Sequence, residues 1–351
     1  MAVSSGQRAL VAVGILLLLA GGAVAFYFYS HHGMLPSLGA GPAPDLMSLL
    51  PADAPVVAYA DVAALRTVAS SQLGAVLGLA SPGPQADKDY ADFVRDTGFD
   101  YTRDLDRAAV AAWPSSLAPA PGQTPIARML ALGDGRFDQN KIQAYTLRTG
   151  RVLQAGAHPI YEAPGESPGQ KLYWMFVSPT RMALASEADL LAGLSNDAPH
   201  QRSPSIEPRI ARVAGAPIFA VAATDSLPES VYANFAGSPQ LEKLARSVKS
   251  LTLAGKPDGD NLKVTLDGEC DSMKNALQIS VMIDGARMLG SVALADPKNQ
   301  GQMTREQAAF LDSLLRQMNV TYQDKWVRVT LTLTPAMLGP GTPSPHAANR
   351  R

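Results

Sequence analysis

The chain has 351 residues, of which 46% are hydrophobic and 17% are charged, whereas average soluble domains carry about 25% charged residues. This charge-poor composition favours an exported protein over a cytosolic enzyme, and the length suggests roughly two domains. Thirty Lys and Arg nearly balance 31 Asp and Glu, so no basic stripe is present and nucleic acid is excluded as a partner.

The first predicted element is an uncharged apolar segment, residues 9–29 (ALVAVGILLLLAGGAVAFYFY). A helix of about 20 residues crosses the hydrocarbon core of a bilayer. Arg8 precedes the segment and no Lys or Arg follows it before Arg66, so the positive-inside rule places residues 1–8 in the cytoplasm and the remainder outside. The segment is therefore predicted to be a single-pass signal-anchor in the inner membrane.

A cleaved signal peptide is the alternative interpretation of the same segment. Ala23-Val24-Ala25 fits the small-x-small cleavage rule, and cleavage after Ala25 would release a secreted or periplasmic protein. Four aromatic residues at positions 26–29 continue the apolar run and favour the uncleaved anchor. The bulk of the chain is exported in either case, and its single cysteine, Cys270, excludes an intrachain disulfide.

The folded region is expected to be α+β, with two similar halves that each pack a mostly antiparallel sheet with helices. This internal repeat rests on the order of the elements and on two similar strands that follow Ala-Pro, within residues 54–60 and 216–222. The expected parts are a Pro- and Gly-rich flexible tether at residues 30–48, a first domain at 49–200, a second domain at 201–335 and a disordered tail at 336–351.

In the first half, short apolar runs predict strands and amphipathic runs predict helices. Gly133-Asp134-Gly135 is expected to be a turn between a strand and a helix. The predicted strands are residues 108–113, 126–132, 159–161, 172–177 and 181–185, and the predicted helices are residues 87–97, 138–149 and 187–194.

In the second half, Leu241, Leu244 and Val248 mark one face of a helix, and a hairpin joins residues 251–253 to 262–266 through Asp258-Gly259-Asp260-Asn261. A capping box that begins at Thr304 starts another helix. In the last strand, residues 327–333, apolar and polar residues alternate, which predicts one buried and one wet face.

The predicted helix at residues 272–289 is apolar on more than one face. We expect it to be buried between the sheet and a neighbouring helix. The alternative is that it lines a lipid-binding groove, because its methionines adapt to varied ligands. Asp284, Arg287 and the short length argue against a second membrane span.

Two candidate nucleophiles are rejected on chemical grounds. Gly165-Glu166-Ser167-Pro168-Gly169 matches the G-x-S-x-G elbow of serine hydrolases, but Pro168 has no N–H for the oxyanion hole and a strand, not a helix, is expected to follow. Cys270 needs a base, and His158 and His200, the only histidines outside the tether and tail, lie beside prolines in expected loops. A hairpin loop and a small core residue are the preferred interpretations.

Acidic residues cluster between positions 87 and 106, where a divalent cation could bind. Basic residues interleave with them, so a solvated helix face with local ion pairs is the preferred interpretation. Neither phosphate-binding loops nor zinc spacings occur, and no catalytic, cofactor-binding or metal-binding residues are assigned. The acidic residues are Asp87, Asp89, Asp92, Asp96, Asp100, Asp104 and Asp106, and the basic ones are Lys88, Arg95, Arg103 and Arg107.

Three stretches resemble a group of uncharacterised bacterial exported proteins with a membrane anchor. They are Leu50-Pro51-Ala52-Asp53-Ala54-Pro55-Val56-Val57-Ala58-Tyr59, then Gly98-Phe99-Asp100 with Arg103-Asp104-Leu105-Asp106, and Gly135-Arg136-Phe137-Asp138. They lie in the first half of the chain. The resemblance implies a bacterial envelope protein and supplies no activity.

Taken together, these features predict a membrane-anchored extracytoplasmic protein that is not an enzyme and that binds an envelope protein or serves as a structural element. One alternative is a periplasmic lipid- or small-molecule-binding protein with a cleft beside residues 273–289. The other is an enzyme whose active-site residues are dispersed along the chain.

Overall fold

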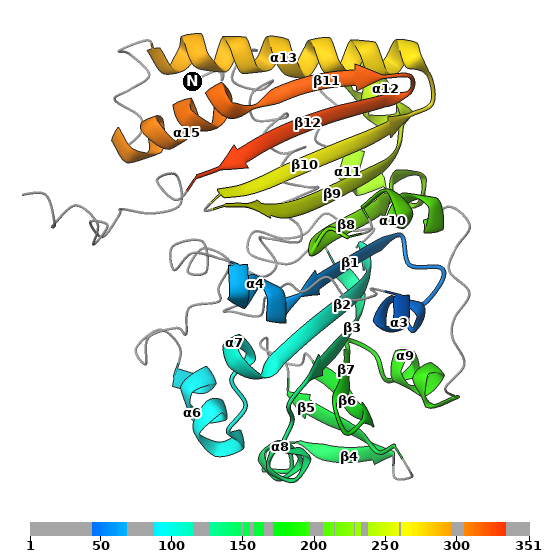
Figure 1. Cartoon of the computed structure of the whole chain (residues 1–351). Coiled ribbons are helices and arrows are strands. Elements are labelled where there is room, and N and C mark those ends of the chain that lie inside the picture. The colour runs from blue at the N-terminus through cyan, green and yellow to red at the C-terminus, as the bar shows by residue number, and fades with distance from the viewer. Residues whose placement is uncertain are drawn as a thin grey trace, which may run out of the picture.

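The computed structural model describes residues 44–68, 88–114, 126–148, 150–154, 158–164, 171–196, 206–213, 215–227, 229–232, 238–259, 261–295 and 305–334. The predicted anchor at residues 9–29 and the tail at 336–351 lie outside these ranges. The described residues form an α+β fold around one antiparallel sheet of 12 strands (Figure 1), which confirms the predicted α+β class. The two halves share this one sheet, whereas the sequence predicted a sheet in each half.

The first half supplies seven strands of this sheet. They are β1 (Val56–Asp61), β2 (Leu105–Pro114), β3 (Ile126–Gly135), β4 (Arg151–Gln154), β5 (Ile160–Pro164), β6 (Lys171–Ser178) and β7 (Arg181–Ala185). Its helices are α3 (Pro44–Ser48), α4 (Val62–Val68), α6 (Lys88–Thr97), α7 (Tyr101–Asp104), α8 (Gln139–Thr146), α9 (Ala188–Ala192) and the 3-10 helix η2 (Gly193–Asn196).

The second half supplies the other five strands. They are β8 (Ile218–Ala223), β9 (Val248–Asp258), β10 (Asn261–Cys270), β11 (Asn319–Gln323) and β12 (Trp326–Leu333). Its helices are α10 (Glu207–Val213), α11 (Glu229–Tyr232), α12 (Pro239–Ser247), α13 (Met273–Ala295), α15 (Arg305–Gln317) and the 3-10 helix η3 (Thr224–Ser226).

The two halves meet in the middle of the sheet, where β1 pairs with β8. Outward from this pair the strands run β1-β2-β3-β7-β6-β5-β4 on one side and β8-β9-β10-β12-β11 on the other. Counted outward from the central pair, the first five strands of each half therefore have the same topology. Three consecutive strands form a meander, and two further strands add to its edge after a helical segment. Ala58 and Ala220, each the third residue of its strand, lie opposite each other, so an approximate two-fold axis passes through this pair.

One core cluster crosses this junction and joins the halves. It contains Val57 and Tyr59 of β1 together with Phe219 and Val221 of β8, and the rings of Tyr59 and Phe219 stack at 5.4 Å. Apolar side chains of α3, α9 and α10 belong to the same cluster. The other face of the sheet carries two separate clusters, one against α8 in the first half and one against α13 in the second.

Each half contains an Asp–Arg pair between the third strand of its meander and the next strand in the sheet. Asp134 on β3 lies opposite Arg181 on β7, and Arg181 Nε donates to Asp134 Oδ1 at 2.6 Å. Asp267 on β10 lies opposite Arg328 on β12, and Arg328 Nε donates to Asp267 Oδ1 at 2.7 Å. The predicted turn at Gly133-Asp134-Gly135 was therefore wrong, because these residues end strand β3 and the arginine allows Asp134 to be buried.

The predicted tether is also shorter than expected. Residues 44–48 form α3, and its Leu46 and Met47 are 1% exposed in the core. These two apolar side chains outweigh the flexible character of the preceding Pro- and Gly-rich sequence.

Candidate functional site

Asp92 and Asp96 of α6 form ion pairs with arginines rather than a cation site. Arg95 contacts Asp92 at 2.5 Å and Asp96 at 2.9 Å, and Arg148 contacts Asp96 at 2.5 Å. Asp87 lies outside the described residues. Among the described residues no group of three or more His, Cys, Asp or Glu is placed to hold a metal ion.

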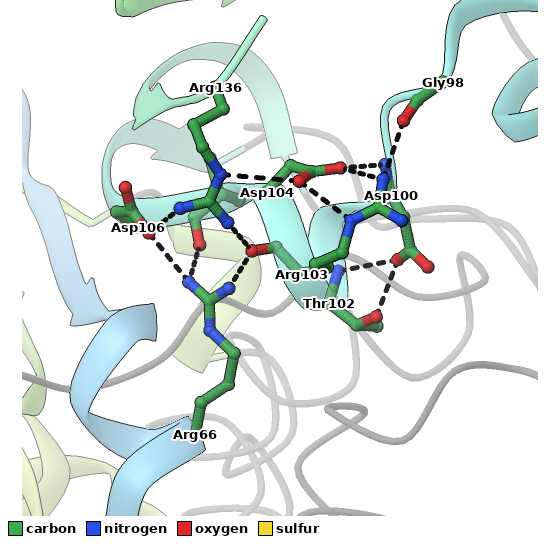
Figure 2. A network of polar contacts seen from close by, with 9 residues as sticks. Arg66, Gly98, Asp100, Thr102, Arg103, Asp104, Asp106 and Arg136 are labelled. Atoms are coloured by element: carbon green, nitrogen blue, oxygen red, sulfur yellow. Dashed lines mark hydrogen bonds and ion pairs between the residues drawn. The ribbon is translucent and has the colours of Figure 1, made fainter.

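The next acidic residues build a tight turn around α7 (Figure 2). Asp100 caps the helix, because its Oδ1 accepts from the backbone N–H of Thr102 at 2.9 Å and from the Thr102 hydroxyl at 2.6 Å. Asp104 Oδ2 accepts from the backbone N–H of Asp100 at 2.9 Å. Arg103 donates through Nε to Asp104 Oδ1 at 2.9 Å and through Nη2 to the carbonyl oxygen of Gly98 at 2.9 Å.

Two arginines from other elements bind this turn. Arg66 of α4 and Arg136, which follows β3, both donate to the carbonyl oxygen of Arg103. Arg66 also donates to the carbonyl oxygen of Leu105 at 2.5 Å and to Asp106 Oδ1 at 2.9 Å. Figure 2 shows both guanidinium groups pointing into the turn, so residues distant in sequence are clamped together here.

The charges of this network keep Asp104 ionised. Burial by itself raises the pKa of Asp104, but hydrogen bonds from Arg103 and from the backbone of Asp100, with the positive charges of Arg103 and Arg136, bring its pKa below the ordinary value. A carboxylate held in this state is a poor proton donor near neutral pH. The network therefore suits a structural role rather than acid–base chemistry. We call the α7 turn together with Arg66 and Arg136 the α7 network.

Cys270 is a core residue at the end of β10. It is 1% exposed, and burial followed by the charges of Asp271 and Glu269 raises the pKa of its thiol to about 11. A thiol with such a pKa is protonated at neutral pH and is a weak nucleophile. His158 is not its base, because His158 Nδ1 lies 3.2 Å from the carbonyl oxygen of Phe176 in the other half.

The Gly165–Gly169 motif lies outside the described residues, but the strands on either side of it are described. β5 ends at Pro164 and β6 begins at Lys171, and these two residues pair in an antiparallel hairpin. A strand thus follows the motif, as the sequence predicted.

The inner face of α13 packs on the sheet. Ala276 and Ile279 are 0% and 8% exposed and belong to one cluster with Cys270 and Val327, against which Ile283 packs. The helix contacts β10, β11, β12, α12 and α15. Figure 1 shows it running along the outer end of the sheet beside β11.

The outer face of α13 is apolar and exposed. With 3.6 residues per turn, Leu277, Val281, Met288 and Val292 align on the side of the helix opposite Ile279, and Leu289 lies at their flank. Their exposed fractions are 40% for Leu277, 63% for Val281, 60% for Met288, 69% for Val292 and 63% for Leu289. We call these five residues the outer face of α13.

The prediction that this helix is buried was therefore wrong. Its apolar residues surround the whole helix, but the sheet covers only one side of it. Fully burying one Val, Leu or Met side chain contributes about 1.5–3 kcal/mol, so leaving five of them in water forgoes several kcal/mol of stabilisation. Large exposed apolar patches on soluble domains mark interaction surfaces.

The neighbouring helix α15 also carries exposed apolar side chains. Phe310 and Leu311 are 39% and 37% exposed on α15, which contacts α13. In the part of the chain that the structure describes, residues 273–294 of α13 form the one helix long and apolar enough to cross a membrane. Its contacts with the sheet and the ion pair between Arg287 and Asp284 at 2.8 Å show a helix lying on a folded domain.

Sequence reasoning identified this helix but ended it at Leu289 and missed Val292, Phe310 and Leu311 as exposed apolar residues. The available signal was the apolar character around the entire helix. That pattern shows that both sides require an apolar neighbour. The sequence pattern does not show that the described residues cover only one of these two sides.

Comparisons with known proteins leave the family open. No family model matches the chain, and no curated protein matches it. Among solved structures, crystal forms III, I and IV of a protein named TP0453 align with TM-scores of 0.46, 0.43 and 0.45 and sequence identities of 11%, 10% and 12%. The alignments cover 84%, 85% and 84% of this chain and 96%, 96% and 94% of the TP0453 chains. Similarity at this level assigns no function.

Proposed function

We propose that the chain is a membrane-tethered extracytoplasmic protein that works by binding a partner through the outer face of α13. The observation that supports this most strongly is the row of exposed aliphatic side chains on a helix otherwise packed into the fold. The uncharged segment at residues 9–29 and the charge asymmetry around it support the tether and its orientation.

A non-enzymatic role is part of this proposal. The two groups with the most suggestive sequence context, Cys270 and Asp104, have pKa values shifted away from catalytic use, the thiol upward and the carboxyl downward. The resemblance of the first half to anchored envelope proteins agrees with a location in the bacterial envelope. The two similar halves would then form a scaffold that presents one binding helix.

A periplasmic lipid- or small-molecule-binding protein is the second candidate. The same outer face of α13 favours it, because aliphatic and methionine side chains suit acyl chains and other apolar ligands. This candidate differs from the first in the partner, not in the surface.

Cysteine accessibility in intact cells tests whether the outer face is covered. The full chain is made with Val281→Cys on α13 or, as the matched control, with Leu153→Cys on β4, where Leu153 is 43% exposed. A membrane-impermeant maleimide is then added to spheroplasts. We expect the control cysteine to react readily and the α13 cysteine to react several-fold more slowly, although Val281 is more exposed than Leu153 in the isolated chain.

Two results would contradict the proposal. Equal labelling of the two cysteines would show that nothing covers α13 in the cell. Labelling of neither site until the cells are lysed would place the folded region in the cytoplasm. Extraction of membranes with alkaline carbonate tests the tether separately, and an anchored chain stays in the pellet.

A further inference from the structure

The residue types of the outer face of α13 limit the kind of partner that it can bind. Interface hot spots between proteins are enriched in Trp, Tyr and Arg. The outer face contains only Leu, Val and Met. The polar residues on the same side of the helix are Lys274 and Gln278 near its start and Asp284, which pairs with Arg287. Such a surface offers mainly apolar area and few directional hydrogen bonds.

The size of the surface also argues against a second copy of the chain as the partner. Five side chains along one helix make a patch on the order of a few hundred Å², as large as the largest apolar patches on monomers. A stable dimer buries about 800 Å² on each partner. A lipid surface needs no matching shape and accepts a single apolar helix face.

The segment between the predicted anchor and α3 is long enough for the folded region to contact the membrane. Between the predicted anchor, which ends at Tyr29, and α3, which begins at Pro44, residues 30–43 span at most ~46 Å when extended. α3 contacts β2, which is six strand positions from β11 in the sheet, or ~29 Å at ~4.8 Å per position. α3 and α13 lie on opposite faces of the sheet, ~10 Å from it on each side, so their direct separation is ~35 Å. The extended tether exceeds this distance, so α13, which packs beside β11, can contact the bilayer that holds the anchor.

We infer that the outer face of α13 lies in the lipid interface of the membrane that anchors the chain, with its aliphatic side chains among the upper acyl carbons. This inference rests on the tethering proposed above. The helix would lie parallel to the membrane plane, because its inner face stays on the sheet. The anchor and α13 would then hold the folded region at two points and fix its orientation.

Lipid-attached quenchers test the inference directly. The full-length chain is reconstituted into vesicles of phosphatidylethanolamine and phosphatidylglycerol, with an environment-sensitive dye on Val281→Cys or on the control Leu153→Cys. The natural Cys270 is buried, and the unsubstituted chain measures any background labelling. We expect brominated acyl chains to quench the dye on α13 several-fold more than the dye on β4.

A variant tests whether the quenching depends on the apolar surface. Met288→Asp with Leu289→Asp places two charges on the outer face, and we expect it to abolish most of the quenching at position 281 without changing the thermal unfolding of the protein. Retained quenching in this variant would overturn the inference. Equal quenching at positions 281 and 153 in the parent chain would do the same.

The readouts separate failure of the inference from failure of the tether. If the chain floats with the vesicles but the dye on α13 is not quenched, the tether stands and the lipid contact is wrong. If the chain does not float with the vesicles, the anchor is wrong and the inference is overturned with it. Dye protection that follows protein density, rather than the brominated lipid, would assign the surface to a second copy and would also overturn the lipid contact.

Discussion

At the scale of single residues, Asp134 and Asp267 lie on corresponding strands of the two halves, β3 and β10, but differ in their surroundings. Asp134 contacts two guanidinium groups, Arg181 at 2.6 Å and Arg107 at 2.9 Å, and its side chain is 9% exposed. Asp267 pairs with Arg328, whose side chain is 52% exposed. The same chemical change should therefore have a larger effect in the first half.

Asp134→Asn is expected to lower the free energy of unfolding by about 3–5 kcal/mol, because two partly buried arginines lose their counter-charge. Asp267→Asn should cost only about 1–2 kcal/mol, since Arg328 can remain hydrated. Urea unfolding of the full chain in detergent, followed by tryptophan fluorescence, measures both. Losses of equal size would show that the two pairs are equivalent in energy and would contradict this prediction.

Glu269 makes the stability depend on acidity. Burial raises its pKa, but hydrogen bonds and charges from Lys325 and Arg209 outweigh this and bring the pKa below 4.5, the ordinary value. A group whose pKa is lower in the folded state than in the unfolded state stabilises the fold fully at pH values above its unfolded-state pKa. This stabilisation is lost as the pH falls through the folded-state pKa. The free energy of unfolding should therefore decrease below about pH 4.5.

The matched variant is Glu269→Gln. It should be less stable than the parent chain at neutral pH and should lose less further stability on acidification, since one titrating group is gone. Unfolding curves recorded at a series of pH values compare the two proteins. An identical acid-side slope would assign the acid sensitivity to other carboxyl groups, Asp104 among them.

At the scale of one element, the two sides of α13 should respond differently to the same kind of truncation. Ile279→Ala removes a side chain from the cluster with Cys270 and Val327 and should cost about 2–4 kcal/mol. Val281→Ala changes a side chain that is 63% exposed and should stay within about 0.5 kcal/mol of the parent. Thermal or urea unfolding of both variants tests this, and a large loss for Val281→Ala would mean that the outer face contributes to the fold.

Strands were predictable where apolar residues alternate or cluster. β7 was predicted with its observed bounds, residues 181–185, and β12 to within one residue. β4 and β11 were missed because nearly all of their side chains are exposed at the edges of the sheet, and backbone pairing alone defines them. β9 was predicted only in part, because the buried polar residues Ser250 and Thr252 interrupt its apolar run.

The site was less predictable than the fold. An apolar helix in a sequence does not reveal what covers each of its sides, because a neighbouring strand, a partner and a lipid all select Leu, Val and Met. The α7 network was also only partly predictable. The acidic residues and Arg103 were visible in the sequence as local ion pairs, whereas the contributions of Arg66 and Arg136 come from the tertiary fold.

At the scale of the whole molecule, the two halves share a sheet and a core rather than standing as separate bodies. Residues 1–200 expressed alone would expose the paired edge of β1 and half of the cluster around Tyr59 and Phe219. We expect each half to be insoluble alone and the two to be recovered together after co-expression. Affinity purification through a tag on one half measures this, and two soluble, folded, non-interacting halves would contradict it.

The pairing of β1 with β8 also governs how the chain can fold. Every other strand pair of the first half closes between segments of that half, but β1 must wait for a strand that follows the whole of it in sequence. Such a contact of high sequence separation is slow to form, because a long loop must be closed before any stabilising contact is gained. A nascent chain would therefore pass through a species in which β1 pairs with β2 but its other edge is still open. This is the stage at which aggregation competes with folding.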